Sequence, residues 1–217
     1  MRHAHDAETR ERLLEVGTRL FGERGYFHVT VRDICREADA NVAAVNYYFG
    51  GKLGLYTEIV QALVGSMREA DPTTAAPAGS SAEERIRHYV RTYVPRIAKP
   101  QGQAVWGQKL MGHETHEPTP LAPWIAEQVI LPRVRYLSEA VAELLGCATD
   151  DPRVGRSVAS LQAQCLFYLP SRFRTTALRG WDARVEAEVD AIAEHIAEFT
   201  LAGIARLAVG GHTGGAS

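Results

Sequence analysis

Residues 113–117 combine side chains that can bind a metal ion or move a proton, namely His113, Glu114, His116 and Glu117. The two histidines lie three positions apart, whereas the helical zinc motif of metalloproteases separates its histidines by four. They can still share an ion on one helical turn. Three nearby prolines, however, favour a helix end or a loop here. We therefore expect a structural or ligand-lining role for this stretch, and no metal site.

The other reactive side chains do not form a catalytic set. The sequence has no P-loop, no dinucleotide-binding glycine motif and no nucleophile–base pair at a recognisable spacing. Cys35, Cys147 and Cys165 are odd in number and widely spaced, which argues against a disulfide framework or a zinc ribbon. Cys165 lies in an apolar helical pattern, so we expect a buried thiol rather than a redox sensor. The sequence thus predicts no enzyme activity and no cofactor.

A second group of residues has the size and chemistry of a surface that contacts DNA bases. Residues 42–48 begin with the small side chains of Val42, Ala43 and Ala44, and they include the amide of Asn46. A helix that enters a major groove about 12 Å wide needs small or hydrogen-bonding residues near its beginning. An asparagine can pair with adenine, and alanine methyl groups can contact the methyl group of thymine. We expect these residues to contact base pairs.

The flanking residues can donate hydrogen bonds to phosphates. Tyr47, Tyr48 and Lys52 follow the base-contacting group, and Thr30 and Arg32 open the preceding helix, where free backbone N–H groups favour an anion. The alternatives are packed aromatic rings for the tyrosines and a solvated surface position for the lysine. Before residue 42 stands one more expected DNA contact, Asn41, which suits a helix N-cap or a left-handed turn residue.

Three short helices must position these side chains. Apolar residues at helical spacing from Leu13 to Phe21 form the first helix, which we expect to end at Gly25. Thr30 and Asp33 fit the N-cap and third position of a second helix. A turn at 39–41 leads to the third helix at 42–48. Three helices with a tight turn between the second and third are typical of a helix-turn-helix.

The rest of the chain also has helical periodicity. We expect a fourth helix from Lys52 to about residue 68, a linker of small residues at 71–82, and helical patterning again from Ile86 to Ile97. A longer helix carries the apolar residues from Leu137 to Leu145, and the next carries those from Val154 to Tyr168 until Pro170 bends or ends it. The last helix spans about 183–208. No strand pattern interrupts them. The sequence therefore predicts an all-α fold, with a helix-turn-helix DNA-binding domain at 1–52 and a ligand-binding and dimerisation domain at 53–217.

The second domain has features of a dimer interface and of a ligand site. Segments 153–176 and 183–207 carry apolar stripes longer than one domain face requires, so we expect them to pair with a second copy as a four-helix bundle. Ligand sites in helical bundles are mostly apolar with a few convergent polar groups. The candidate ligand contacts, which can alternatively be plain core residues, are Trp106, Lys109, His113, Trp124, Gln162, Cys165 and Tyr168.

Composition gives weaker information. The 217-residue chain has a formal net charge of −2, and residues 1–52 hold eight basic and eight acidic side chains. Charge alone therefore argues weakly against a nucleic-acid partner. The sequence has no run of 18 apolar residues and no apolar secretory segment at its beginning, so we expect a cytoplasmic protein without a membrane partner.

Residues 9–56 resemble the DNA-binding domain of the tetracycline-repressor (TetR) family. Three segments carry the resemblance: TRERLLEVGTRLFGERG, YFHVTVRDICREA and NVAAVNYYFGGKLGLY. The last segment is similar to the subgroup with a CerR-like (CecR-type) C-terminal domain, which is echoed near Glu114, at 130–132 and at 162–165. Asn46 stands where the family commonly has tyrosine and Tyr48 where it commonly has histidine, so an operator sequence cannot be transferred from the wider family.

The resemblance implies a function. Such proteins are homodimers that bind near-palindromic double-stranded operator DNA and usually leave it when a small-molecule effector binds. We therefore expect a transcriptional regulator, a ligand-released repressor. The alternative is a helical small-molecule-binding protein or enzyme without a role in DNA binding.

Overall fold

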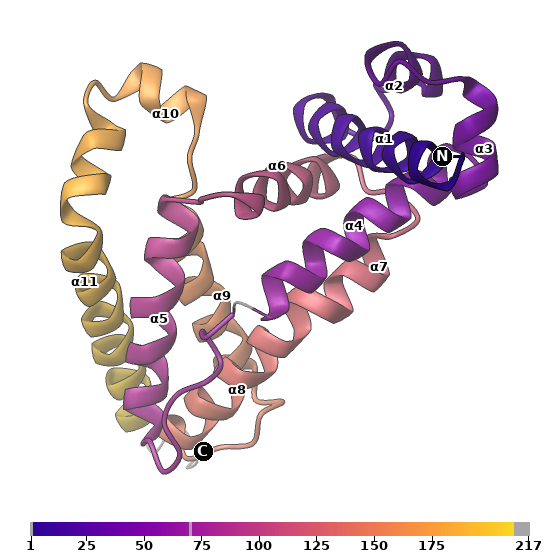
Figure 1. The fold of residues 1–217 in the computed structure, drawn as a ribbon. Coiled ribbons are helices and arrows are strands. Elements are labelled where there is room, and N and C mark those ends of the chain that lie inside the picture. Colours follow the sequence, from indigo (N-terminus) through magenta and orange to yellow (C-terminus); the bar gives the residue numbers. More distant parts are fainter. Residues whose placement is uncertain (1, 70, 211–217) are drawn as a thin grey trace. The chain divides into compact units, whose positions relative to one another are not determined.

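The computed structural model describes residues 2–69 and 71–210, with side chains at 6–68, 71–171 and 174–209. Every regular element in these ranges is a helix, which confirms the predicted all-α fold (Figure 1). The elements are α1 (Arg2–Arg24), α2 (Val31–Glu37), α3 (Val42–Phe49), α4 (Lys52–Glu69), α5 (Ala82–Ala98), α6 (Gln103–His116), α7 (Ala122–Ile125), a π-helical turn (Ala126–Ile130), α8 (Leu131–Leu145), α9 (Pro152–Leu166), α10 (Arg172–Ala177) and α11 (Trp181–Gly210).

The chain divides into two compact units. The first comprises residues 1–70 and 101–129 and holds α1–α4, α6 and α7, and the second comprises residues 71–100 and 130–217 and holds α5 and α8–α11. Compactness thus groups α4, α6 and α7 with the helix-turn-helix. The predicted functional division at residue 52 stays a prediction.

The first unit has its own hydrophobic core. Helices α1, α2 and α3 contact one another, α1 and α3 also contact α4, and α6 packs against α1 and α4 (Figure 1). Of the predicted apolar positions of α1, Leu13, Leu20 and Phe21 are buried and Val16 is half-buried, and Gly25 ends that helix with a φ of 80°, as expected. The core side chains that hold the helix-turn-helix on α4 are Leu13, Leu20, Phe21, Ile34, Val45, Leu55, Tyr56 and Ile59.

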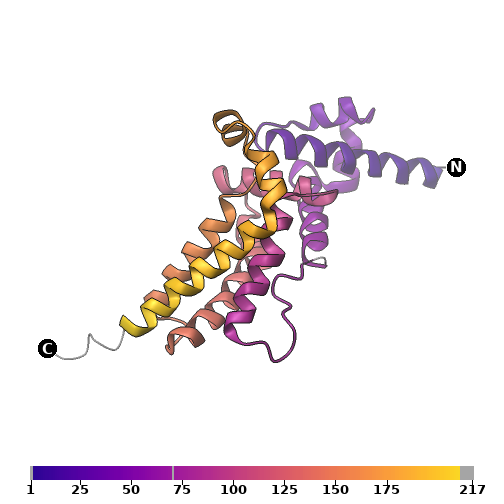
Figure 2. The same cartoon turned by 90° about the vertical axis from the view of Figure 1, so that its left-hand side faces the viewer.

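The second unit is a bundle in which α5, α8, α9 and α11 pack side by side (Figures 1 and 2). Its core includes Ile86, Tyr89, Val90, Leu137, Val141, Leu161 and Ile196, all buried. Burial of this apolar surface is what holds the four helices together.

Helix α9 ends before Pro170, where the sequence predicts that the helix bends or ends. Helix α9 ends at Leu166, and the chain turns before α10 begins at Arg172. The physical reason is Pro170, which has no N–H to continue a helix and clashes with the preceding turn. Helix α11 extends slightly beyond the expected 183–208 and runs from Trp181 to Gly210.

Two observations concern the environment of the protein. Among the described residues, no helix is both long and apolar enough to cross a bilayer. Cys35, Cys147 and Cys165 are free thiols.

Candidate nucleic-acid interface

Helix α3 presents a continuous face to solvent. Val45 and Phe49 are buried one helical turn apart, which fixes α3 on the core of the first unit. Ala43, Asn46 and Tyr47 are exposed on the other side, and the side chain of Tyr47 is 79% exposed. An aromatic ring with so little packing contributes little to the fold. The α3 face therefore has the exposure and the hydrogen-bonding groups that contact with a partner requires.

Both ends of α3 are fixed by local interactions. Oδ1 of Asn41 accepts a hydrogen bond from the backbone N–H of Ala43 at 2.8 Å, so Asn41 is the N-cap. The left-handed residue of the turn is Asp39, with a φ of 47°. At the other end Gly50 is left-handed and its N–H donates to the carbonyl of Asn46. These caps stop α3 after two turns.

The junction from α3 into α4 depends on a glycine. A Cβ on Gly54 would overlap the carbonyl oxygen of Phe49, which is backbone and has no side-chain freedom with which to move away. The absence of a side chain at Gly54 therefore lets α4 begin directly against the end of α3.

The beginning of α2 is closed by a reciprocal capping box. The N–H of Asp33 donates to Oγ1 of Thr30 at 3.1 Å, and the N–H and hydroxyl of Thr30 donate to Oδ2 of Asp33 at 3.0 and 2.6 Å. These bonds from Thr30, joined by the guanidinium of Arg36, hold the pKa of Asp33 below its usual range. The hydroxyl of Thr30 is thus already engaged within the protein, whereas Arg32 is exposed.

Two other predicted phosphate contacts have partners inside the first unit. The hydroxyl of Tyr48 donates to Oδ1 of Asp6 at 3.3 Å, and burial together with that carboxylate raises the pKa of Tyr48. Nζ of Lys52 lies 4.2 Å from the ring centroid of Tyr26, and burial lowers the pKa of Lys52. Each side chain must leave its partner, or share it, to reach a phosphate.

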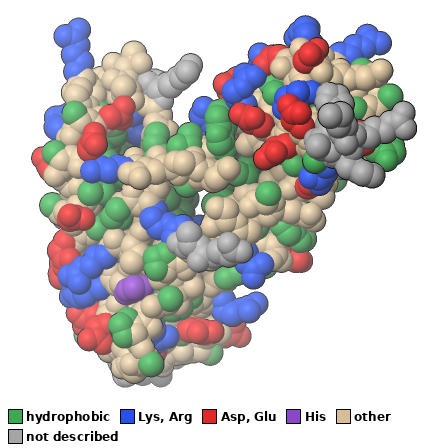
Figure 3. Space-filling model, in the orientation of Figure 1, with side chains coloured by type: hydrophobic (Ala, Val, Ile, Leu, Met, Phe, Trp, Pro, Cys, Tyr) green, Lys and Arg blue, Asp and Glu red, His purple; other side chains and the backbone are tan. Residues whose placement is uncertain are grey.

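Charge does not single out this surface. On the face shown in Figure 3, acidic and basic side chains alternate over the α1–α3 region rather than forming one basic patch. Guanidinium groups are neutralised by carboxylates, as in the pairs Arg10–Glu58 and Arg19–Glu37. Arg32 makes no ion pair with any residue that the structure describes, so it remains available to an external anion.

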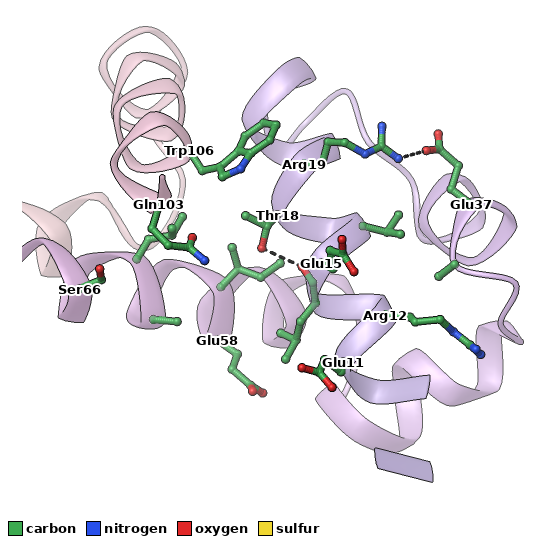
Figure 4. Close-up of a pocket in the computed structure, with 16 residues that line it drawn as sticks. Glu11, Arg12, Glu15, Thr18, Arg19, Glu37, Glu58, Ser66, Gln103 and Trp106 are labelled. Atoms are coloured by element: carbon green, nitrogen blue, oxygen red, sulfur yellow. Dashed lines mark hydrogen bonds and ion pairs between the residues drawn. The ribbon is translucent and has the colours of Figure 1, made fainter. Parts of the chain in front are cut away.

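A groove of about 830 Å³ opens elsewhere on the first unit, between α1, α4 and α6. Figure 4 shows Glu11 and Glu58 on one side of it and Trp106 on the other. Its lining holds more carboxylates than guanidinium groups, which disfavours phosphate binding. The lining also includes Glu15, Glu37, Arg12 and Arg19.

Helix α6 is joined to α1 by two contacts that depend on glycine. A Cβ on Gly22 would lie 2.6 Å from Cε3 of Trp106, so the indole packs directly on the backbone of α1. Nε2 of His113 lies 3.2 Å from the carbonyl oxygen of Gly22, and its ring packs on Gly25. His113 therefore has a structural role, and the described residues contain no cluster of metal ligands.

Helix α6 is joined to α4 by a buried hydrogen-bonded group that the sequence analysis missed. The hydroxyl of Tyr56 donates to Oε1 of Glu114 at 2.6 Å, and the hydroxyl and N–H of Thr119 donate to the same carboxylate at 2.7 and 3.0 Å. Burial and the Glu114 carboxylate raise the pKa of Tyr56 far above its usual value. Tyr56 fitted an apolar helix stripe in the sequence, and Glu114 fitted a possible metal motif, so no local signal joined them.

The predicted ligand contacts fall into both compact units. Trp106, Lys109, His113 and Trp124 belong to the first unit, where Nζ of Lys109 lies 4.5 Å from the ring centroid of Trp106. In the second unit, burial raises the pKa of Cys165 to about 12, Tyr168 stacks on Trp181, and Gln162 is half-buried. Cys165 is thus the expected buried thiol. Whether any of these residues contacts a ligand stays a prediction.

Comparisons with known proteins agree in both halves of the chain. Residues 13–59 match a model described as bacterial regulatory proteins, tetR family. Residues 82–204 match a model described as the C-terminal domain of the HTH-type transcriptional dual regulator CecR. The CecR protein of Shigella flexneri is 27% identical over 195 residues, which span 85% of this chain and 86% of the relative. A probable HTH-type transcriptional regulator of Bacillus subtilis, YttP, is 40% identical over 52 residues, which span 24% of this chain and 25% of the relative.

Solved structures share the fold. HlyIIR, a hemolysin II transcriptional regulator, has a TM-score of 0.57 and 19% identity, over 89% of this chain and 97% of that one. AibR, solved in complex with isovaleryl coenzyme A and operator DNA, also has a TM-score of 0.57, with 16% identity over 74% of this chain and 85% of that one.

Proposed function

Because this chain belongs to the tetR family of bacterial regulatory proteins and carries a C-terminal domain of the CecR type, we propose that it is a repressor that binds a palindromic operator as a homodimer and leaves it when a small molecule binds. The family consists of transcriptional regulators, so the chain is a regulator and not an enzyme. Its three free thiols and its DNA partner fit the cytoplasm.

The observation that carries this function is the exposed face of α3. The side chains of Ala43, Asn46 and Tyr47 are exposed and contribute little to the hydrophobic core. Contact with a partner molecule therefore explains them better than a role in the fold. A DNA major groove fits a two-turn helix whose first residues are small and whose later residues are hydrogen-bonding. In our proposal Asn46 contacts a base, Ala43 and Val42 contact methyl groups, and Tyr47 contacts a phosphate.

Arg32 supplies a further phosphate contact in this proposal. It is exposed on α2 and makes no ion pair with a described residue. Thr30 contributes indirectly, since its hydroxyl and its N–H are bonded to Asp33 and thereby hold the beginning of α2 in place. In our proposal a DNA phosphate competes with Tyr26 for Lys52 and with Asp6 for Tyr48, so that both side chains contact the DNA backbone.

The second unit offers a surface for dimerisation. On α11, Phe199 is 63% exposed and Leu207 and Val209 are also exposed. Phe167, at the end of α9, is exposed too. Exposed aromatic and aliphatic side chains on two adjacent helices are typical of a helix-bundle interface between copies. We propose that α9 and α11 pack against α9 and α11 of a second copy. The dimer then presents two α3 helices that are related by a two-fold axis.

Release of DNA follows if the effector prefers a state in which the two α3 helices no longer match successive major grooves. Within the first unit, a displacement of α6 reaches the helix-turn-helix through three contacts: Trp106 on Gly22, His113 on Gly22, and Glu114 with Tyr56. Tyr56 lies one turn after Lys52, where α4 begins. In this proposal the hydrogen-bonded group couples effector binding to the orientation of α3.

The test is selection of bound sequences from random DNA duplexes with the purified full-length chain. The proposal expects enrichment of a two-fold symmetric sequence whose half-sites lie about 34–36 Å apart, or somewhat more where the DNA deforms. Enrichment of no sequence, or of a sequence without symmetry, contradicts it.

A further inference from the structure

The groove between α1, α4 and α6 has the size of a small-molecule site. Its volume of about 830 Å³ falls within the range of about 300–1,000 Å³ that such sites occupy. Every residue that lines it belongs to the first unit, so the groove is complete within one compact unit. Of the predicted ligand contacts, Trp106 lies in its wall (Figure 4). The groove therefore offers a binding site on the unit that carries α3.

Part of the lining is apolar and accessible. Leu14 and Val16 on α1 and Trp106 on α6 are half-buried, and Ala62 on α4 is exposed. Covering apolar surface that faces water is favourable, because water is released from it. This part of the groove suits the apolar body of a ligand.

The charged part of the lining is acidic. Four carboxylates and two guanidinium groups line the groove, from Glu11, Glu15, Glu37, Glu58, Arg12 and Arg19. The described residues outside the lining that form ion pairs with them add no net charge: Glu8, Arg10, Glu23 and Arg24. The ammonium of Lys109 lies 4.5 Å from the ring centroid of Trp106 and reduces the negative excess without cancelling it. The groove therefore attracts a cation and repels an anion.

Glu11 and Glu15 carry the unpaired part of this charge. Both are exposed on α1, and neither forms an ion pair with a residue that the structure describes. The charge of Glu15 also acts on Arg19, but the pKa of Arg19 is raised chiefly by its hydrogen bond to Glu37. Because positions four apart are neighbours on a helix, the two carboxylates repel each other. A cation placed between them offsets that repulsion and donates charge-assisted hydrogen bonds to both.

We propose that the groove binds a primary amine with an apolar body. The ammonium group donates to Glu11 and Glu15, and the apolar body lies along Val16, Ala62 and Trp106. A primary ammonium has three donors, which suits two neighbouring carboxylates. The matching alcohol has the same apolar body but no charge, so it binds more weakly. This site goes beyond the proposed function, because neither operator binding nor release by the effector requires it.

The test is isothermal titration calorimetry of the full-length protein with 3-phenylpropylamine or with 3-phenylpropan-1-ol. We expect saturable binding of one amine per chain, with an affinity that falls as the salt concentration rises. We expect the alcohol to bind more weakly by a factor of about ten or more, because it carries no charge to pair with the carboxylates.

Ala62→Lys is the key variant, because it places an ammonium group in the groove from an exposed position and leaves the core intact. We expect it to lose amine affinity by a factor of about ten or more, since like charges repel and the lysine stem occupies the groove. Gln61→Lys is the matched control. It adds the same charge one position earlier on α4, at an exposed residue that does not line the groove. We expect Gln61→Lys to keep the amine affinity within a factor of about two.

A double variant, Glu11→Gln with Glu15→Gln, tests the carboxylates. It keeps the size of both side chains and removes their charges, so we expect the preference for the amine over the alcohol to disappear. The control is Glu186→Gln with Asp190→Asn, which removes two exposed carboxylates at the same spacing on α11. We expect this control to keep the wild-type preference.

The inference is wrong if the wild type shows no saturable binding of the amine. It is also wrong if Ala62→Lys or the variant at Glu11 and Glu15 binds the amine as tightly as the wild type does. Equal losses in Ala62→Lys and Gln61→Lys overturn it as well, since the net charge of the unit, and not the groove, would then decide binding. Operator binding is measured on the same proteins without the amine, so a failure of the proposed function appears separately.

Discussion

The hydroxyl of Tyr56 donates to Oε1 of Glu114 at 2.6 Å, and through this bond helix α4 is joined to α6 inside the first unit. The hydroxyl and the N–H of Thr119 also donate to the Glu114 carboxylate, and both Glu114 and Thr119 are buried. A buried carboxylate is tolerated only where hydrogen bonds replace water. These hydrogen bonds therefore hold α6 at one position along α4. A displacement of either helix requires the other helix to move or the bond between Tyr56 and Glu114 to break.

Tyr56→Phe removes one of these bonds and keeps the ring. We expect the free energy of unfolding to fall by about 1–3 kcal/mol, because the buried carboxylate keeps its cost of burial and loses a donor. Urea unfolding monitored by circular dichroism measures the change. Tyr47→Phe is the control, since the Tyr47 ring is exposed and its hydroxyl supports no buried group. Equal stability of both variants would show that the Tyr56–Glu114 bond contributes nothing.

Gly54→Ala places a methyl group against the carbonyl oxygen of Phe49. We expect a lower melting temperature and weaker DNA binding, because α3 and α4 must separate to admit the methyl group. The matched control is Gly65→Ala in the same helix, where a Cβ meets nothing within 4 Å. There alanine removes only the conformational freedom of glycine and stabilises by about 0.5–1 kcal/mol. Opposite signs for the two substitutions are expected, and destabilisation by both would contradict the assignment.

Arg32→Ala removes the proposed phosphate contact on α2. We expect weaker binding to every duplex and a slope of log K against log salt concentration that is smaller by about one. Fluorescence anisotropy titrations at several salt concentrations measure the slope. Arg91→Ala on α5, whose guanidinium pairs with Glu194, serves as the control and should leave the slope unchanged. An unchanged slope for Arg32→Ala would remove that residue from the interface.

Thr30→Ala opens the capping box of α2, and its effect should depend on pH. Hydrogen bonds from Thr30 lower the pKa of Asp33 in the folded state. Stability from this carboxylate is therefore present above the unfolded value of 3.8 and is lost as pH falls through the lower, folded value. We expect the wild type to melt above Thr30→Ala at pH 7 and the difference to shrink in that acidic range. Thr57→Ala, at a threonine bonded to the Leu53 carbonyl, should give a difference that does not vary with pH.

Phe199→Glu places a charge on the proposed dimer surface of α11. We expect a monomer in analytical ultracentrifugation and loss of specific DNA binding, because one α3 helix contacts only half a site. Leu178→Glu is the control, since Leu178 is also exposed but lies in the turn between α10 and α11. A dimer that persists in Phe199→Glu would exclude α11 from the interface.

Local signals account for what the sequence predicted well. Thr30 with Asp33 at α2, Asn41 before α3 and Gly25 after α1 all end or begin helices where expected, because capping depends on neighbours within a few residues. The helix-turn-helix followed from these signals and from the apolar spacing. The end of α9 before Pro170 also followed from a local signal, since proline cannot continue a helix.

Long-range pairs had no such signal. Tyr56 and Glu114 are 58 residues apart, and Asp71 and Arg133 are 62 apart. Which residues pair is decided by how the helices pack, and helical periodicity indicates only that a side chain faces inward.

Contact between the exposed face of α3 and DNA bases can be tested by a single titration. Fluorescence anisotropy measures binding of the wild type and of Asn46→Ala to the DNA upstream of the protein's own gene and to an unrelated duplex of equal length. We expect the wild type to prefer the upstream DNA by a factor on the order of 10³ or more at physiological salt. We expect Asn46→Ala, with an unchanged circular dichroism spectrum, to lose about 1–3 kcal/mol of that preference. Equal wild-type affinity for the two duplexes, or an Asn46→Ala variant with undiminished preference, would contradict contact between α3 and the bases.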